Sequence, residues 1–405
     1  TMGSASTTSL TEIPNGDDAL FIGNESSLPG EKFLHGGLDD LRIRSSVVST
    51  EELLEASEGS GPWIDVSRGH FDAGDYGKYM INSALALHTM IFTADAILQL
   101  PGSSEGPDPL DNLGIPESGD GIADVLQEAK WEADYIAKMQ DTDGGFFFIV
   151  HPRGRSFESN VLPSEGDRQV VWPKTMSATG SGVAALVETA SSPSFQRQFP
   201  EAAARYMEAG MRGWAFIERA VAKHGVAGAH QRITHYGDLA ESRDEMAWAA
   251  SALFAATGES AYEARMKEWM PWDAEELHGT AYGWREFRRF TWQKLYEAAG
   301  PAMRTYIFAN RGARSGRSIS YDGSLVGPKS YRDHVIDELL GGADDLVAWA
   351  EDNPYRSSIP SESKRFGSVT YYFAIADGFD LITAHLLDPK QAYFETMLDG
   401  LNYPL

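Results

Sequence analysis

Residues 65–86 read DVSRGHFDAGDYGKYMINSALA and lead from an acidic, glycine-rich turn into an apolar helical run. Two carboxylates, Asp72 and Asp75, stand three residues apart just before that run. The intervening Gly74 is expected to let the backbone turn sharply and to expose Asp75 at the head of the helix. A helix N-terminus would favour the ionised carboxylate that a general base needs. Taken alone, the same spacing is also typical of a helix cap, since Asp is a preferred capping residue.

Apolar residues recur with a period of 3.6 through most of the remaining chain, which predicts about ten helices. The predicted ranges are 79–100, 120–140, 174–191, 201–223, 243–257, 260–269, 293–309, 331–350, 367–386 and 390–400. Strand patterns are sparse, and the best one, GGFFFIVHP at 144–152, is expected to form a short hairpin. The pattern predicts an all-α fold of paired helices: a solenoid, a bundle or an α/α toroid. The lack of a fixed-period repeat disfavours the solenoid.

Composition excludes several kinds of partner. The formal net charge of -25 would repel nucleic acid and anionic membranes, whereas a neutral polysaccharide or oligosaccharide is indifferent to it. Cysteine is absent from the 405 residues, which excludes thiol catalysis, disulfides and thiolate metal sites. No run approaches 18 consecutive apolar residues, so no membrane-spanning helix is expected.

The first 60 residues differ from the rest and are predicted to form a separate β-rich segment. The runs DALFIGNESS at 18–27 and FLHGGLDDLRIRSSVVSTEELLEA at 33–56 suggest two short strands and a helical turn. The second run resembles the closing strands of a laminin-G-like or concanavalin-like sandwich, of which only a part would be present. The alternative is a loosely packed leader. The domain boundaries are therefore placed at 1–60 and 61–405.

Three ordered stretches resemble glycoside hydrolase family 9, the inverting cellulases and their relatives. Residues 65–86 are similar to the family's DVSGGWyDAGDygKYvvN, and residues 121–145 to its iPDiLDEarWeldwmLkMQ…GG. Residues 235–262, HYGDLAESRDEMAWAASALFAATGESAY, are similar to YgD…DElaWAAaeLyrATGd.sY. The resemblance spans residues 63 to 402 and implies an (α/α)6 toroid with a substrate cleft at one end.

The resemblance also implies roles for individual residues. Asp75 matches the family's general base, and Asp72 matches the aspartate that holds the attacking water. Tyr236 matches a tyrosine lining the catalytic centre. Trp172 and Trp284, in loops, are candidate platforms on which sugar rings stack, although a buried structural role is an equal alternative.

Two further site predictions concern a histidine and a metal. His151 is a candidate cleft residue, and a hydrogen-bonded loop histidine is its alternative. Asp244 and Glu245 match an acidic pair that ligates calcium in many family members. The Ser-Gly that precedes that pair in those members is replaced here by Ala240-Glu241, so a solvated or Arg-paired helix start is the alternative. No cofactor is expected to be required; calcium remains an option.

The sequence departs from the family pattern at both ends. The family's first helix, ending in FYxxQRSG, and its C-terminal motifs, which carry the general acid, have no match here. An incomplete, C-terminally truncated toroid is therefore expected. Three glutamates, Glu117, Glu158 and Glu286, lie in or near loops without a motif that would assign them as the acid.

The expected function is hydrolysis of β-1,4-glycosidic bonds in cellulose, cello-oligosaccharides or a related β-glucan with inversion. One alternative is a non-catalytic carbohydrate-binding relic; another is an unrelated toroid enzyme such as a polysaccharide lyase, which would not explain Asp-Ala-Gly-Asp. The insertion at 151–175, with basic residues Arg153, Arg155, Arg168 and Lys174, is either a block at one end of the cleft or a set of salt-bridge partners. A secreted or periplasmic location follows from the family alone.

Overall fold

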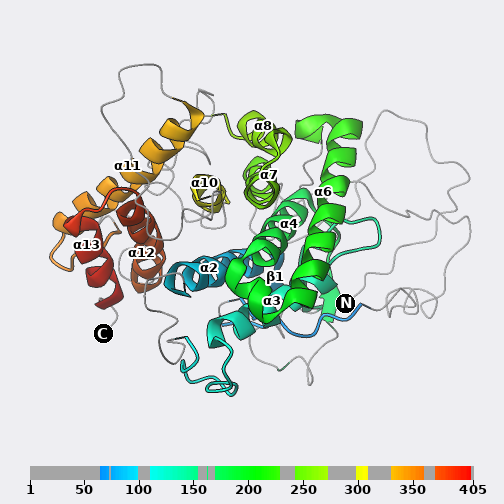
Figure 1. Ribbon diagram of the computed structural model, residues 1–405, viewed down its shortest axis with the longest axis horizontal. Coiled ribbons are helices and arrows are strands. Elements are labelled where there is room, and N and C mark those ends of the chain that lie inside the picture. Colours follow the sequence, from blue (N-terminus) through cyan, green and yellow to red (C-terminus); the bar gives the residue numbers. More distant parts are fainter. Residues whose placement is uncertain are drawn as a thin grey trace, which may run out of the picture.

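The structure of the chain is a computed structural model. It describes residues 64–72, 74–98, 110–153, 162, 169–228, 242–271, 298–308, 330–359 and 370–402. Most of these residues lie in helices, as the all-α prediction requires (Figure 1). The predicted β-rich segment at 1–60 lies outside the described residues. The boundary placed at 60 remains a prediction.

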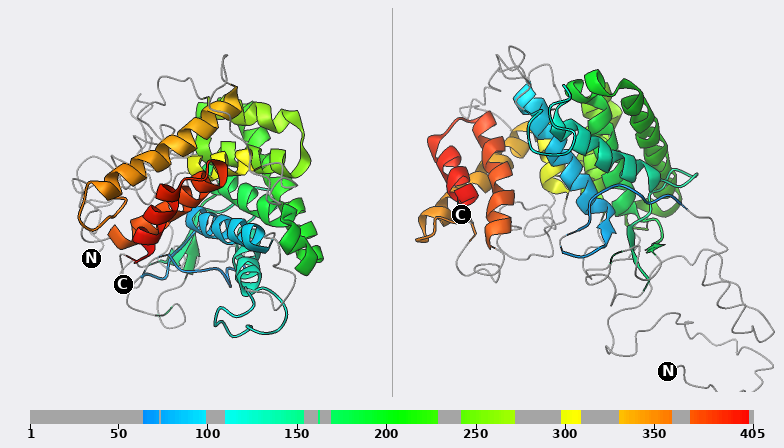
Figure 2. Two further views of the ribbon diagram at one scale, coloured as in Figure 1. Left: turned by 60° about the vertical axis from the view of Figure 1, so that its left-hand side comes forward. Right: turned by 90° about the horizontal axis from the view of Figure 1, so that it is seen from below.

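Helices that follow one another in the chain pack in pairs, and these pairs build two layers (Figure 1). The inner layer contains α2 (Met80–Leu98), α4 (Met176–Ser191), α7 (Arg243–Thr257), α10 (Ala299–Ile307) and α12 (Thr370–Leu387). The outer layer contains α3 (Asp124–Lys138), α6 (Pro200–Gly228), α8 (Ser260–Trp269), α11 (Tyr331–Glu351) and α13 (Gln391–Asn402), and the short α5 (Pro193–Gln198) joins α4 to α6. From two further sides, α12 and α13 lie at the opposite end of this array from α6 (Figure 2).

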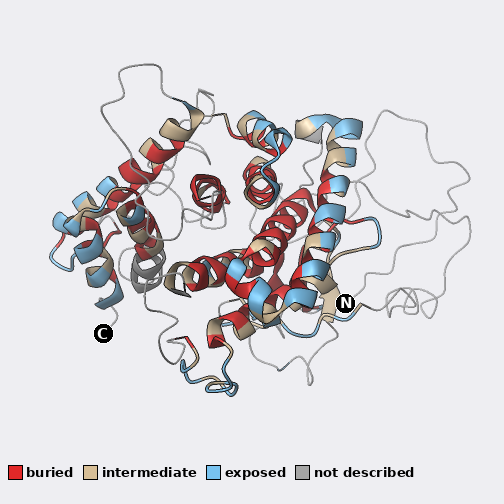
Figure 3. Ribbon diagram, in the orientation of Figure 1, coloured by how far each residue is buried: buried red, intermediate tan, exposed pale blue. Residues whose placement is uncertain are grey.

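Burial separates the two layers. Helices α4, α7 and α10 are buried on nearly every side, whereas α6, α8 and α13 expose their outer faces (Figure 3). The contact between α4 and α7 is close because Gly180 has no side chain: a Cβ there would lie 2.7 Å from the backbone of Glu245. Helix α2 is long and apolar enough to cross a membrane by composition. It packs instead against α3 and α4, and Met80, Ala84 and Leu87 on it are fully buried.

Glu188 of α4 lies at the centre of a polar network between the inner helices. Its side chain is 3% exposed and accepts hydrogen bonds from three helices: from His88 Nδ1 of α2 at 2.7 Å, from Trp248 Nε1 of α7 at 2.7 Å, and from Thr305 Oγ1 of α10. A buried carboxylate is tolerated only when it is hydrogen-bonded in this way. These three contacts therefore fix how α2, α7 and α10 sit around α4.

Arg304 extends the network to a fifth inner helix. Its Nε donates to His88 Nε2 at 3.2 Å, and its Nη1 pairs with Asp380 Oδ1 of α12 at 2.6 Å. Because arginine only donates, His88 must accept at Nε2 and carry its proton on Nδ1, which is the proton given to Glu188. Burial lowers the pKa of Arg304 to about 10. Through Glu188 and Arg304, the five inner helices share one chain of buried hydrogen bonds.

The described part of the chain has one three-stranded antiparallel sheet, in the order β1-β2-β3. β1 (Lys78–Tyr79) pairs with β2 (Ile149–Pro152), so that Lys78 lies opposite Val150, and β2 pairs with β3 (Gln169–Val171). The sequence predicted a hairpin at 144–152, and a strand is found there. Its partners were not predicted: β1 directly follows the acidic turn, which ties that turn to the sheet.

Candidate active site

Asp72 and residues 74–77 form a closed turn ahead of β1. The amide N–H of Asp72 donates to the carbonyl of Gly77 at 2.8 Å, and the N–H of Asp75 donates to the carbonyl of Asp72 at 3.3 Å. Each carboxylate is also oriented by a donor: Gly77 N–H reaches Asp75 Oδ1 at 2.7 Å, and Asn82 Nδ2 reaches Asp72 Oδ1 at 2.6 Å. Both side chains remain partly exposed. Asn82 matches the last residue of the family pattern quoted for this stretch, but the sequence alone did not assign it this role.

The turn differs from expectation in two respects. Asp75 does not stand at the head of a helix, because α2 begins five residues later at Met80 and β1 lies between them. The field of the helix N-terminus falls off within one turn, so it does not act on the carboxylate of Asp75. Gly74 has no positive φ and has open space where a Cβ would stand. The sharp turn comes earlier, at Arg68 and Gly69, both of which have φ of 71°.

The segment before the turn is pressed onto α3. A Cβ on Gly69 would lie 2.5 Å from the ring of Tyr135, so only glycine fits there. The ammonium of Lys78 donates to the carbonyls of Val66 and Arg68, the latter at 2.7 Å. It also lies 4.5 Å from the centroid of the Tyr135 ring. Backbone and side chains together thus hold the approach to the acidic turn against one face of α3.

Two ion pairs fasten the same segment further along α3. Lys138 pairs with Asp65 at 2.6 Å, and Arg68 pairs with Asp134. The hydrogen bond from Lys138 holds the pKa of Asp65 well below its usual range. Arg68 also lies 5.3 Å from the ring centroid of Trp131, a tryptophan that is 46% exposed. These contacts join residues more than 60 positions apart in the chain.

Two predicted binding residues belong to the sheet whose first strand follows the turn. His151 lies on β2, and Trp172 follows β3; their rings are 5.3 Å apart and tilted by 53°. His151 is 3% exposed and directs Nδ1 at the carbonyl of Pro152, whereas Trp172 is partly exposed. The structure thus puts His151 beneath Trp172. A substrate contact for either residue remains a prediction. Tyr236 and Trp284 lie outside the described residues.

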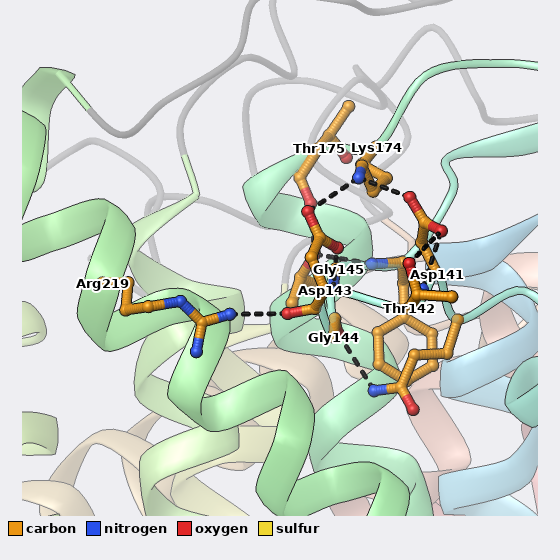
Figure 4. Close-up of polar contacts among 11 residues, drawn as sticks. Asp141, Thr142, Asp143, Gly144, Gly145, Lys174, Thr175 and Arg219 are labelled. Atoms are coloured by element: carbon orange, nitrogen blue, oxygen red, sulfur yellow. Dashed lines mark hydrogen bonds and ion pairs between the residues drawn. The ribbon is translucent and has the colours of Figure 1, made fainter.

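The turn at 141–145 shows what one of the basic residues of the insertion does (Figure 4). Lys174 pairs with Asp141 at 2.6 Å and with Asp143 at 2.8 Å, and Arg219 donates to the backbone carbonyl of Asp143. The hydrogen bond from Lys174 is the main cause of a lowered pKa at Asp141. Lys174 is thus a salt-bridge partner. Arg155 and Arg168, like Glu158 and Glu286, lie outside the described residues, and Glu117 is exposed on a loop.

The predicted calcium pair lies in the first turn of α7. Asp244 and Glu245 are 2% and 4% exposed, and Asp244 Oδ2 accepts from the N–H of Ala298 at 2.8 Å. Burial raises the pKa of Asp244, and a hydrogen bond with Glu245 opposes this shift. Calcium needs six to eight oxygens, and no third acidic or histidine side chain joins the pair among the described residues. Any further ligands would have to come from outside them, so the site remains a prediction.

Comparisons with known proteins concern the chain as a whole and its arrangement of helices. The chain is 26% identical to a xyloglucan-specific endo-beta-1,4-glucanase of Bacteroides ovatus over 367 residues, covering 85% of this chain and 54% of that protein. It is 22% identical to Endoglucanase D of Acetivibrio thermocellus over 361 residues, covering 88% of this chain and 51% of that protein. The chain thus spans about half the length of these curated relatives.

Solved structures give the same picture of the fold. A metagenome-derived glycoside hydrolase family 9 endoglucanase superposes with a TM-score of 0.61 at 21% identity, over 84% of this chain and 55% of that one. A family 9 protein of Bacteroides ovatus superposes with a TM-score of 0.61 at 22% identity, over 83% of this chain and 57% of that one. The fold is the expected all-α toroid. Since the sequence model of glycosyl hydrolase family 9 matches residues 35–403, the chain belongs to that family.

Proposed function

We propose that the protein hydrolyses β-1,4-glycosidic bonds in cellulose, cello-oligosaccharides or a related β-glucan. The observation that carries the proposal is the closed turn in which Asp72 and Asp75 are each oriented by a hydrogen-bond donor while remaining partly exposed. Two oriented carboxylates next to open space at Gly74 suit the activation of a water molecule. Membership of glycosyl hydrolase family 9 supports the same reaction class.

The proposed reaction is a single displacement with inversion. Asp75 accepts a proton from water as that water attacks the anomeric carbon, and Asp72 orients the water. The glycosidic oxygen leaves with a proton from a carboxylic acid on the other side of the sugar ring, about 6.5–9.5 Å from the base. We assign no residue to that acid. Each acid or base of this kind contributes about 10²–10⁴ to the rate, so both are needed for efficient turnover.

The proposed substrate is a neutral polysaccharide or oligosaccharide. A net charge of -25 disfavours polyanions, and sugar rings can stack on partly exposed aromatic side chains such as Trp172. One relative carries xyloglucan specificity in its name, which makes branched and unbranched β-1,4-glucans the first substrates to compare. The proposed location is outside the cytoplasm, where such polymers occur.

The proposal is tested by replacing the base. Release of reducing ends from cello-oligosaccharides, cellulose and xyloglucan is measured for the wild type and for Asp75→Asn, with His224→Gln on the exposed surface of α6 as a control. We expect the first variant to lose about 10²–10⁴ of the wild-type rate and the control to lose none. A wild type that binds the oligosaccharide without cleaving it would contradict the proposal and favour a carbohydrate-binding relic.

No cofactor is required by this reaction. Calcium at Asp244 and Glu245 would act on the fold near the start of α7, because two buried adjacent carboxylates are stabilised by a cation. It supplies no step of the proposed chemistry.

A further inference from the structure

His70 departs from the family pattern and lies two residues before Asp72. The motif that residues 65–86 resemble has a tryptophan at this position. Here the imidazole ring stands between two glutamates of α3: Nδ1 is 2.5 Å from Glu132 Oε2, and Nε2 is 2.5 Å from Glu128 Oε1. The backbone N–H of His70 also donates to Glu132 Oε2 at 2.8 Å. These three residues are called the His70 clamp.

Both partners in the His70 clamp accept hydrogen bonds when ionised. A neutral imidazole can donate from one nitrogen only, whereas the protonated ring donates from both. The side chain of Glu132 is fully buried, and its other oxygen has no hydrogen-bond partner among the described residues. A buried carboxylate in this position is costly unless a positive charge meets it. The geometry therefore calls for a protonated His70.

We infer that the protonated side chain of His70 is a positioning residue that holds the turn of Asp72 and Asp75 against α3. This inference rests on the proposed function, in which those two carboxylates activate water. The turn lies between the segment 64–70 and β1 in the chain. Asn82 of α2 holds the Asp72 carboxylate directly, and the His70 clamp is the contact with α3 that lies nearest to Asp72 in the sequence. When the ring loses its charge, one of its two glutamates loses the hydrogen bond from the ring.

The electrostatic surroundings support a charged ring near neutral pH. The hydrogen bond to Glu132 is the main cause that raises the pKa of His70 to about 9, and Glu128 adds to it. Lys78 of β1 also interacts electrostatically with Glu132, and burial lowers the pKa of Lys78 to about 8. The remaining charged groups on this face of α3 and on the segment packed against it are Asp65, Arg68, Lys130, Asp134 and Lys138.

The consequence for the proposed activity concerns its pH–rate profile. The decrease in rate on the alkaline side should be set by the titration of His70. Hydrolysis should fall as pH rises through about 9, the pKa of His70. An arginine at this position keeps two donors and does not titrate in this range. His70→Arg should therefore retain most of the wild-type kcat near neutral pH and lose the alkaline limb. His70→Gln, which carries no charge, should lose at least about tenfold in kcat near neutral pH, with a smaller change in KM, because the turn that bears the base is misplaced. The difference from the wild type should shrink above about pH 9, where the wild-type ring is neutral too.

Two measurements on the full chain test the His70 clamp without requiring turnover. The ring carbon Cε1–H signal of His70 is titrated by NMR and identified by its loss in His70→Gln. We expect a midpoint near 9 in the wild type and a midpoint shifted toward 6.5 in Glu132→Gln. The second measurement is amide hydrogen exchange of Asp72 and Gly77, which donate the hydrogen bonds of the turn. Exchange at neutral pH should be at least about tenfold faster in His70→Gln and return to the wild-type rate in His70→Arg.

The outcomes separate this inference from the proposed function. A His70 midpoint near 6.5 in the wild type, or exchange in His70→Gln as slow as in the wild type, overturns the His70 clamp whatever the catalytic result. An alkaline limb that persists unchanged in His70→Arg also overturns it and assigns the limb to another group such as Lys78. A wild type that shows the expected titration and exchange but does not cleave any glucan overturns the proposed function and leaves the His70 clamp as a structural contact. The His224→Gln control should match the wild type in every measurement.

Discussion

Replacing Glu188 with alanine is expected to destabilise the described core strongly. Its carboxylate accepts hydrogen bonds from His88, Trp248 and Thr305, all within the inner helices. Alanine removes all three at once and leaves the buried charge of Arg304 facing a histidine without its acceptor. The loss therefore spreads through the whole network.

The magnitude follows from what is left unpaired. A buried donor without an acceptor costs about 1–3 kcal/mol, and breaking a buried ion network by removing one partner typically costs about 3–5 kcal/mol. The three donors share one site, and water can enter the space that the side chain vacates, so the individual costs do not simply add. We therefore expect Glu188→Ala to lower the free energy of unfolding by about 3–5 kcal/mol.

Glu188→Gln keeps the shape of the side chain and removes its negative charge, so it measures the effect of the charge alone. The amide oxygen can still accept from Trp248 and Thr305, but the amide nitrogen then meets the Nδ1 proton of His88. Moving that proton to Nε2 would only bring it against the donating Nε of Arg304. The conflict cannot be relieved within the network, and we expect a loss of about 1–3 kcal/mol.

Urea unfolding followed by tryptophan fluorescence and by far-ultraviolet circular dichroism measures both variants, and coincident transitions would support a two-state treatment. The control is Glu208→Ala on α6, which removes a carboxylate that is 73% exposed and paired with Arg212; we expect a change within about 0.5 kcal/mol. The reasoning is refuted if Glu188→Ala loses no more than this control. Should Glu188→Ala fail to fold, Glu188→Gln carries the test.

Three other changes follow from the site. Gly69→Ala should lower the free energy of unfolding by about 2–4 kcal/mol, because a positive φ and a clash with Tyr135 act together, whereas Gly74→Ala, with open space around it, should change it little; equal effects in urea unfolding would contradict this. The folded-state pKa of His70 is raised from 6.5 to about 9, so its stabilisation is complete below about pH 6.5 and is lost as pH rises through about 9. Since the ring is 44% exposed, solvent screening reduces the contribution of this pKa shift to the free energy of unfolding to about 1 kcal/mol. The difference in free energy of unfolding between wild type and His70→Gln should close above pH 9, and a difference independent of pH would argue against this role of His70. If Asp244 ligates calcium, added Ca²⁺ raises the Tm of the wild type and not of Asp244→Asn, and an equal response would remove calcium from the account.

Most of the fold could be predicted because residues close together in the sequence determine where a helix ends and which face is apolar. The ranges predicted for α7 and α8, 243–257 and 260–269, coincide with those observed, since Gly258 ends α7 in a left-handed conformation and marks the break between them. The sheet could not be predicted as a whole. Strands of two to four residues are too short to show a period, and β1 exists only because Ile149 and Val150 lie beside it.

The candidate site also has a part that could be predicted from the sequence and a part that could not. Asp72 and Asp75 could be picked out because their turn chemistry is contained within a few residues. The position of Asp75 at a helix head was wrong, because the pairing of β1 with a strand some 70 residues away delays the start of α2. The contacts that hold the turn, from His70 to Glu132 and from Arg68 to Asp134, join distant segments and carry no local signal. The roles predicted for Tyr236, Trp284 and the calcium pair remain predictions.

The stereochemistry of the first product tests the central claim most directly. Proton NMR of a cello-oligosaccharide digest, recorded before mutarotation, reads the anomeric configuration of the newly formed reducing end. Direct attack by a water held by Asp72 and Asp75 predicts the α-anomer from a β-linked substrate, with the signal lost in Asp75→Asn. A β-anomer as the first product, or an α-anomer formed equally fast by Asp75→Asn, would contradict the assignment of Asp75 as the base.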